Sequence, residues 1–262
     1  MSAVGAVGAL FGRDIRAVVR SRSQLYSSMF TPLLFLIFLG NGVSEGLEPA
    51  NLKAGNFTAY LVAGVVVMTS VFSATFSSAS YYKDRDSGML RMLLSSPHSA
   101  RTVLFGKSLA GVCIGVVQAS VVLLLAAPFV EFEWQYGLVG GLLVAGATIV
   151  LLNVMLSGLA QALASRVETM QGFHLVMNLA LFPLLFFSGA FFPVDNLPPW
   201  LEVMARINPF SYAVDALELA AYADGTAGFF GLAIDFAVMG ALAVGVYALG
   251  LARTPRLTWS GK

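Results

Sequence analysis

The order of apolar and polar positions divides the chain into long apolar segments separated by short polar ones. Six of the apolar segments approach the length of about 20 residues that a helix needs to cross the hydrocarbon layer of a bilayer. They cover roughly residues 25–43, 58–80, 103–127, 137–164, 173–192 and 229–251. Each should be helical, because an open strand would leave backbone groups unpaired in lipid. The pattern therefore predicts an all-α membrane protein with six transmembrane helices, in a single domain over residues 1–262.

A shorter segment ahead of the first apolar run also follows a helical period, but with two different faces. Its apolar residues recur on one side: Phe11, Ile15, Val18 and Val19. Its arginines recur on another side: Arg13, Arg16 and Arg20. This pattern predicts an amphipathic helix on the inner membrane surface, with its arginines among the lipid headgroups. A short basic flank that only sets the topology is the alternative interpretation.

The distribution of charge orients these spans. With six spans, both termini lie on one side of the membrane, and that side holds 13 of the 15 Lys and Arg residues, leaving Lys53 and Arg206 on the other. Short loops rich in Lys and Arg remain in the cytoplasm, so both termini should be cytoplasmic. The composition agrees with a membrane protein, since 58% of the residues are apolar and 11% are charged. That charged share is about half of what a typical soluble domain carries.

Motifs for nucleotide or metal chemistry are absent from the sequence. The segment RTVLFGKS, residues 101–108, has Arg101 where a phosphate-binding loop requires Gly, and a loop between two spans provides no preceding strand. Lys107 in this segment is expected to extend toward the headgroups instead. His98 and His174 lie far apart in the sequence and form no zinc-binding pair. We therefore expect no catalytic residue, no metal and no cofactor on this chain, and no nucleic acid partner.

Several polar residues fall inside the predicted spans. Gln118 and Asn153 lie in the third and fourth spans, and His174 and Asn178 lie one helical turn apart in the fifth. Such residues usually hydrogen-bond to a neighbouring helix, and contact with a transported substrate is the other possibility. The candidate substrate path comprises Gln118, Asn153, His174, Asn178, Phe182 and Phe186.

Asp235 is the only acid inside a predicted span, near the outer end of the sixth. An ionisable residue within the membrane is a candidate functional group. A side chain that snorkels to the nearby interface is the alternative, so the sequence leaves the role of Asp235 open.

The loop between the second and third spans, residues 83–107, carries the first of two recognisable segments. It starts with alternating charges, continues as a short apolar helix and stops at Pro97. An exposed apolar face on a short cytoplasmic helix favours a protein partner. The segment resembles the ABC-2 family of exporter permeases, in which a charged stretch is followed by Gly-x-Leu, a Leu-rich turn ending at Pro, and Gly-Lys. The matching residues are Asp84, Arg85, Asp86, Gly88, Leu90, Leu93, Leu94, Pro97, Gly106 and Lys107.

The second segment, residues 186–222, is similar to the other hallmark of that family, an outer re-entrant turn after the fifth span. Prolines in this stretch break the helix before it leaves the membrane, and a Trp is typical of the headgroup level. Glu218 stands where the family often has Arg. The matching residues are Ser188, Gly189, Phe192, Pro193, Leu197, Pro198, Trp200, Asn208, Pro209 and Tyr212.

The resemblance covers nearly the whole chain and implies an ABCG-like (type V) exporter transmembrane domain. It would have an inner amphipathic N-terminal helix, a cytoplasmic coupling helix and an outer re-entrant turn. The family further implies two copies of a separate ABC ATPase subunit that binds ATP and Mg, and a second permease subunit, identical or related. The expected location is the inner membrane of a bacterium, and the expected cargo is a hydrophobic or amphipathic drug, lipid or glycolipid. An ATP-independent channel or secondary transporter is the alternative, although such proteins usually carry ionisable residues deep in the membrane.

Overall fold

The computed structural model of the chain describes residues 3–44, 57–95, 99–130, 132–192, 198–222 and 229–252. Every regular element within these ranges is helical, which confirms the predicted all-α class. The elements are α1 (Ala3–Arg20), α2 (Arg22–Ser44), α3 (Phe57–Ser77), α4 (Ala79–Asp86), α5 (Met89–Leu94), α6 (Ala100–Ala126), the 3-10 turn η2 (Ala127–Phe129), α7 (Gly137–Ala164), α8 (Met170–Phe186), α9 (Pro199–Ile207), α10 (Pro209–Ala221) and α11 (Leu232–Ala252).

Four helical segments in the described part of the chain are long and apolar enough to cross a membrane. The bent pair formed by α1 and α2, with an angle of 63° between its halves, brings the number to five if it counts as one span. α8 is apolar but has only 17 residues. The chain is therefore a multi-pass membrane protein with four to five candidate spans, and the number six stays a prediction. The four segments are Phe57–Asp86, Ala100–Phe129, Gly137–Ala164 and Leu232–Leu249.

The predicted boundaries agree well with the helices in the middle of the chain and less well at the fifth span. The range 137–164 coincides with α7. The range 173–192 extends beyond α8, which ends at Phe186. The chain turns directly after this helix, where Gly189 has a φ of 87°. That left-handed conformation is routine only for Gly, so the helix cannot continue through this position.

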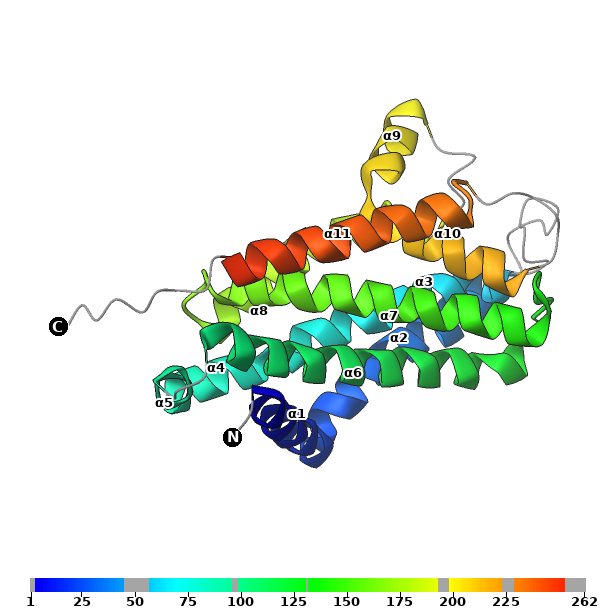
Figure 1. Cartoon of the computed structure of the whole chain (residues 1–262). Coiled ribbons are helices and arrows are strands. Elements are labelled where there is room, and N and C mark those ends of the chain that lie inside the picture. Colours follow the sequence, from blue (N-terminus) through cyan, green and yellow to red (C-terminus); the bar gives the residue numbers. More distant parts are fainter. Residues whose placement is uncertain are drawn as a thin grey trace.

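α3 is the central helix of the bundle. Of its most apolar stretch, 89% is buried within the chain, against 17% for α11. It packs against α2, α6 and α7, and the long helices run side by side (Figure 1). The exposed apolar faces of the outer helices are compatible with lipid contact, because lipid tails and Leu side chains are equally apolar.

Two glycines allow the closest contacts in this bundle. A Cβ atom on Gly64 of α3 would lie 2.2 Å from the carbonyl oxygen of Ala190, in the turn after α8. A Cβ atom on Gly115 of α6 would lie 1.9 Å from Oδ1 of Asn153 on α7. Small residues at helix crossings permit such approaches in membrane bundles. The glycines therefore fix how closely α3 and α6 meet their neighbours.

The two ends of the bundle differ. At one end, called here the α5 end, α4 and α5 lie near α1 and the start of α6 (Figure 1). α9 instead stands out from the side of the bundle (Figure 1). Trp200, Met204 and Ile207 on α9 are 63%, 51% and 74% exposed, so this helix presents apolar side chains away from the chain.

Candidate functional site

The α5 end contains the segment that resembles the family's coupling region. α4 ends at Asp86, and Gly88 follows with a φ of 74°, which reverses the chain before α5 begins. A side chain at this position would be strained in the left-handed conformation. Gly88 therefore allows α4 and α5 to form a tight corner between the two long helices α3 and α6. Pro97, predicted to stop the short helix, lies outside the described residues.

A buried ionic cluster joins three helices beside this corner. Lys107 Nζ of α6 donates to Asp14 Oδ2 of α1 at 3.0 Å, to Asp84 Oδ2 of α4 at 2.6 Å and to Ser80 Oγ at 3.0 Å. Arg13 donates to Asp14 Oδ1 at 2.8 Å and also pairs with Asp84. The side chains of Lys107 and Asp14 are each 5% exposed. Lys107 and the two carboxylates are thus largely shielded from solvent and paired, as buried charges must be. Arg13, with a side chain 32% exposed, completes the cluster at its outer edge.

The cluster corrects two expectations from the sequence. Lys107 does not extend outward, because its ammonium group is held by two carboxylates inside the bundle. The face of α1 that the bundle covers also matches the predicted apolar face only in part: Val18 is 8% exposed, but Val19 is 60% exposed, and Asp14 is covered as well at 3%. α1 packs along α6, and Asp14 lies on the face of α1 that meets Lys107 of α6. The buried residues of α1 are Ala6, Leu10, Asp14 and Val18.

The charge of Arg13 is maintained within this cluster. Burial acts to lower its pKa, but hydrogen bonds to Asp14 and Asp84 and attraction to their charges outweigh that effect, so the pKa of Arg13 is raised. From the sequence, Arg13 was predicted among lipid headgroups and Asp84 in the coupling motif, and neither was expected to pair with the other. A signal in the sequence could have paired Asp14 with Lys107: Asp14 is the only acid before Glu45, and Lys107 is the last charged residue before the apolar run that ends ahead of Glu131.

The three charged residues of the predicted coupling motif have different surroundings. Asp84 belongs to the buried cluster, whereas Arg85 Nη1 donates to the carbonyl oxygen of Val167 at 3.1 Å. Tyr82 donates to the same carbonyl at 3.2 Å. Asp86 is exposed. The motif therefore anchors α4 to α6 and to the turn after α7, and it leaves Asp86 on the surface.

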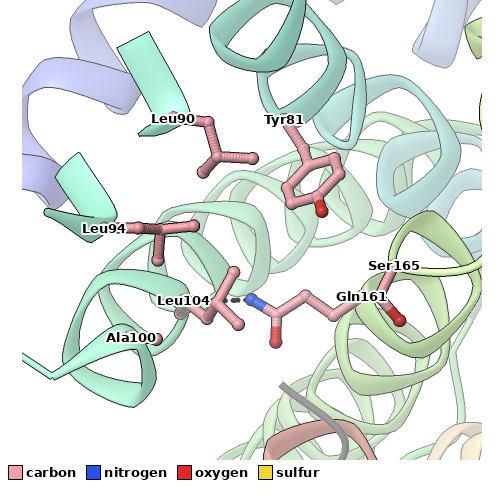
Figure 2. A pocket seen from close by; sticks show the side chains of 7 residues that line it. All are labelled: Tyr81, Leu90, Leu94, Ala100, Leu104, Gln161 and Ser165. Carbon is pink, nitrogen blue, oxygen red and sulfur yellow. Dashed lines mark hydrogen bonds between the residues drawn. The ribbon is translucent and has the colours of Figure 1, made fainter. Parts of the chain in front are cut away.

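α5 is fixed to the bundle through one of its faces. Leu90 is 7% exposed and, with Leu94, points into a small hollow between α4, α6 and α7 (Figure 2). Gln161 closes one side of the hollow and donates to the carbonyl oxygen of Leu104 (Figure 2). Leu90 is therefore not part of the exposed apolar face expected for this helix, because the chain's own helices cover its side chain. Its role in coupling stays a prediction. The hollow is lined by Tyr81, Leu90, Leu94, Ala100, Leu104, Gln161 and Ser165.

The opposite face of α5 remains open. Met92 is 63% exposed and Met89 is 37% exposed. Arg91 is also exposed, and Leu93 is half-buried. α5 thus presents two flexible apolar side chains and one cation outward, while Leu90 holds it from behind. Met side chains adapt readily to an apolar partner surface.

The predicted outer turn begins with a compact arrangement after α8. Ser188 Oγ donates to the carbonyl oxygen of Leu185 at 2.7 Å, which satisfies a free carbonyl near the helix end. The carbonyl oxygen of Gly189 accepts a hydrogen bond from Tyr60 of α3. The turn is therefore tied to the central helix. Pro193 lies outside the described residues.

Asn208 and Tyr212 organise the second half of this segment. Asn208 Oδ1 accepts from the backbone N–H of Phe210 at 3.0 Å and caps α10, which begins at Pro209. Asn and an N-terminal Pro both favour this helix start. Tyr212 donates to the carbonyl oxygen of Arg206 at 2.7 Å. Pro198 similarly precedes α9, with Trp200 in its first turn. The Asn-Pro-x-x-Tyr motif thus sets the corner between α9 and α10.

The six candidate substrate-path residues divide into two groups. Gln118 Nε2 donates to Ser28 Oγ of α2 at 2.8 Å, and Asn153 Nδ2 donates to Ser70 Oγ of α3 at 3.1 Å. Gln118 and Asn153 are 4% and 2% exposed, respectively. They lie in the interior of the bundle and bridge neighbouring helices, which is the more common role of such residues.

The other four residues share one side of α8. His174, Asn178, Phe182 and Phe186 recur every four residues, the spacing that aligns side chains on a helix. Asn178 is exposed, and Phe186 is 47% exposed. His174 packs against Phe76 of α3, with ring centroids 6.0 Å apart. The structure therefore brings these four into one stripe, apart from Gln118 and Asn153.

The chain matches a family model over most of its length. The model described as ABC-2 type transporter covers residues 5–222. This range includes the ionic cluster, α5 and the turn after α8.

Curated relatives give a consistent picture. The putative transport permease ycf38 of Pyropia yezoensis is 30% identical over 224 residues, which are 82% of this chain and 73% of that protein. Nodulation protein J of Rhizobium meliloti (strain 1021) is 26% identical over 205 residues, 74% of this chain and 72% of that protein. The probable multidrug ABC transporter permease YbhR of Escherichia coli (strain K12) is 26% identical over 151 residues, 58% of this chain and 40% of that protein.

Proposed function

We propose, from the fact that this chain belongs to the ABC-2 type transporter family, that it is the permease subunit of an ATP-driven exporter. As a member of that family it is a membrane component of an ABC transport system. The finer proposal is that the complex moves a hydrophobic or amphipathic cargo outward, such as a drug, lipid or glycolipid. ATP and Mg would bind to a separate ABC ATPase subunit, present in two copies.

The proposed topology has six spans with both termini in the cytoplasm of a bacterium. α2 and α8 would supply the first and fifth spans, and the four longer segments would supply the rest. The uneven distribution of Lys and Arg supports the orientation, because 13 of 15 would then lie on the cytoplasmic side. In this orientation the α5 end faces the cytoplasm, and α9 and α10 belong to the outer re-entrant segment.

The structural observation that carries the proposal is that α5 packs against the bundle on one face and is exposed on the other. Leu90 and the neighbouring ionic cluster fix the α4–α5 corner to α1, α6 and α7, while Met89 and Met92 face outward. A partner that binds the exposed face would therefore move a segment already joined to several spans. We assign this outward face to the ATPase, with Asp86 and Arg91 at its charged margin. Rigid connection on one side and an open apolar face on the other are what a coupling helix requires.

We further propose that the stripe on α8 faces a second permease subunit, identical or related, across the cargo path. An exposed amide such as Asn178 is costly against lipid hydrocarbon, which supports a protein or cargo neighbour. The aromatic residues Phe182 and Phe186 would then contact an apolar cargo. Gln118 and Asn153 have a lesser part in this proposal, because their amide groups already bridge helices.

The test is purification of the chain from its native membrane, identification of any bound ABC ATPase, and reconstitution of the complex in liposomes. We expect an ATPase to co-purify and ATP hydrolysis to rise with candidate cargo. The permease alone should neither bind nor hydrolyse ATP, because it has no phosphate-binding loop. Transport by the permease alone, driven by an ion gradient and indifferent to ATP, would instead support a secondary transporter.

A further inference from the structure

Asp235 in the first turns of α11 is fully buried yet has no ordinary hydrogen-bond donor. Its exposure is 0%, so the interpretation in which it snorkels to the surface is wrong. Neither of its carboxylate oxygens accepts a hydrogen bond from a donor group among the described residues. An isolated charged carboxylate in such a place would carry a large desolvation cost. The burial therefore demands either a neutral Asp235 or a cationic partner.

The neighbour of Asp235 is a second acid, Asp215 of α10. Gly231 joins the two, because its N–H donates to Asp215 Oδ2 at 3.3 Å and its carbonyl oxygen accepts from the Asp235 N–H at 3.1 Å. Asp215 already accepts three backbone hydrogen bonds from the chain leading into α11. Phe229 N–H donates to Oδ1 at 2.7 Å, and the N–H groups of Phe230 and Gly231 donate to Oδ2 at 2.9 and 3.3 Å. Three donors at a helix N-terminus stabilise the ionised form of a carboxylate. Both oxygens of Asp215 are therefore satisfied by donors, whereas those of Asp235 are not.

Among the described residues, no cation forms an ion pair with either acid. Arg206 of α9 lies over the Phe229 ring, 4.8 Å from its centroid, but its guanidinium group is paired with Glu202 at 2.7 Å.

Among titratable groups, α3 contributes only Tyr60, which donates to Gly189, and α8 only His174, which packs against Phe76. α7 has no ionisable residue, and the other titratable group of α11, Tyr247, lies three turns away and bonds to Ser108. α10 also carries Tyr212, which donates to the carbonyl oxygen of Arg206, and Glu218, but Asp215 is the acid of α10 that bonds to the start of α11. Two adjacent buried carboxylates cannot both be ionised without a large repulsion.

We propose that Asp235 keeps its proton and donates it in a hydrogen bond to Asp215, so that the pair is a proton-binding site joining α10 to α11. The carboxylic acid of Asp235 supplies the donor that the surrounding helices lack, and Asp215 supplies the charge that accepts it. The bond links α11 directly to the helix that it follows in the chain. Loss of the proton would place two like charges between α10 and α11 and force them apart.

A proton fits this site better than a metal ion does. Asp215 directs both its oxygens at backbone N–H groups, whose partial positive charges would repel a cation. The described residues also hold no group of three or more His, Cys, Asp or Glu side chains suited to a metal. Two carboxyl groups, one of them already occupied, are too few ligands for Ca²⁺, which takes six to eight oxygens.

Infrared spectroscopy of the purified full chain tests the proposal without any transport assay. We expect the carbonyl-stretch band of a protonated carboxyl group at neutral pH in the wild type. The band should be lost in Asp235→Asn and kept in Glu168→Gln, which alters an exposed acid between α7 and α8. Absence of the band from the wild type, or its survival in Asp235→Asn, would overturn the assignment. Because the readout does not involve ATP or cargo, its failure is separate from a failure of the proposed function.

Thermal unfolding supplies a second, independent measurement. Asp235→Asn keeps a donor in place and should unfold near the wild-type Tm, whereas Asp235→Leu leaves Asp215 without that donor and should unfold at a lower temperature. Raising the pH from neutral to alkaline should lower the Tm of the wild type more than that of Asp235→Asn. If added Na⁺ or Ca²⁺ raises the Tm of the wild type but not of Asp235→Asn, the pair binds a cation and the proton assignment is wrong.

Discussion

Lys107 Nζ lies 2.6 Å from Asp84 Oδ2, and this ion pair connects the long helix α6 to the short helix α4 at the α4–α5 corner. The same ammonium group lies 3.0 Å from Asp14 of α1. A movement of the α4–α5 corner therefore acts on α6 through a charge pair as well as through the chain. In the proposed transporter, that pair is a direct mechanical connection between the ATPase side and the bundle.

The first prediction concerns this cluster. Lys107→Met leaves Asp14 and Asp84 to share Arg13 alone, and loss of one partner from a buried ion pair costs about 3–5 kcal/mol. We expect a clear drop in the thermal stability of the purified chain. Lys83→Met is the matched control, because Lys83 is exposed on α4. Equal stability of the two variants would show that the cluster is not structurally important.

A second prediction separates the two faces of α5. Leu90→Asp buries a charge in the hollow beside Tyr81 and should destabilise the chain by several kcal/mol, seen as poor recovery of folded protein. Met92→Asp changes an exposed side chain and should leave the fold intact while ATPase binding and export are lost together. Ser95→Asp, also exposed, is the control for added charge. A folded Met92→Asp variant that keeps its ATPase and exports normally would remove α5 from the contact.

The close approach of α3 to the turn after α8 gives a third prediction. Gly64→Ala places a methyl group 2.2 Å from the backbone oxygen of Ala190, which cannot move aside as a flexible side chain could. Overpacking of this kind typically costs about 1–3 kcal/mol, so the thermal unfolding temperature should fall. Gly146→Ala on α7 meets nothing within 4 Å and should unfold at or above the wild-type temperature. The opposite ranking of these two variants would contradict the packing described.

The fourth prediction concerns topology. In a Cys113→Ala background, single cysteines at Ser2, Ser95 and Ser260 should be shielded from an impermeant thiol reagent in intact cells. A cysteine at Asn51 should react, because the loop between the first two spans would lie outside. Permeabilised cells provide the control, since all four sites should then be labelled. Labelling of the cysteine at position 95 in intact cells would contradict the proposed topology, because this loop would then lie outside the cell.

Long apolar runs predicted most of this fold because the need to satisfy backbone groups in lipid leaves few alternatives to a helix. α7 was located to the residue for that reason. Periodicity was less informative on α1. It selected Phe11, Ile15, Val18 and Val19, of which the chain buries Val18, but it gave no sign that Asp14 would be buried too. The inward face of an amphipathic helix depends on its neighbour, and the sequence did not show that α1 would meet Lys107 on α6.

Leu90 illustrates a second limit. α5 has only six residues, fewer than two turns, so its apolar residues occupy all sides and no period identifies an outward face. The motif located the corner correctly but could not separate Leu90, which is buried, from Met92, which is exposed. Similarly, Asp235 could be recognised as unusual from the sequence, but its partner Asp215 became evident only when α10 and α11 were seen together.

The ionic cluster also has a consequence for biosynthesis. Asp14 and its partner Lys107 are 93 residues apart in the chain, so α1 leaves the ribosome long before α6 exists. During that interval Asp14 has no partner on α6, and α1 can reach its final position only after the third apolar segment has been inserted. Nascent chains that stop before residue 107 should therefore leave α1 accessible to added protease, whereas chains that extend past α6 should protect it.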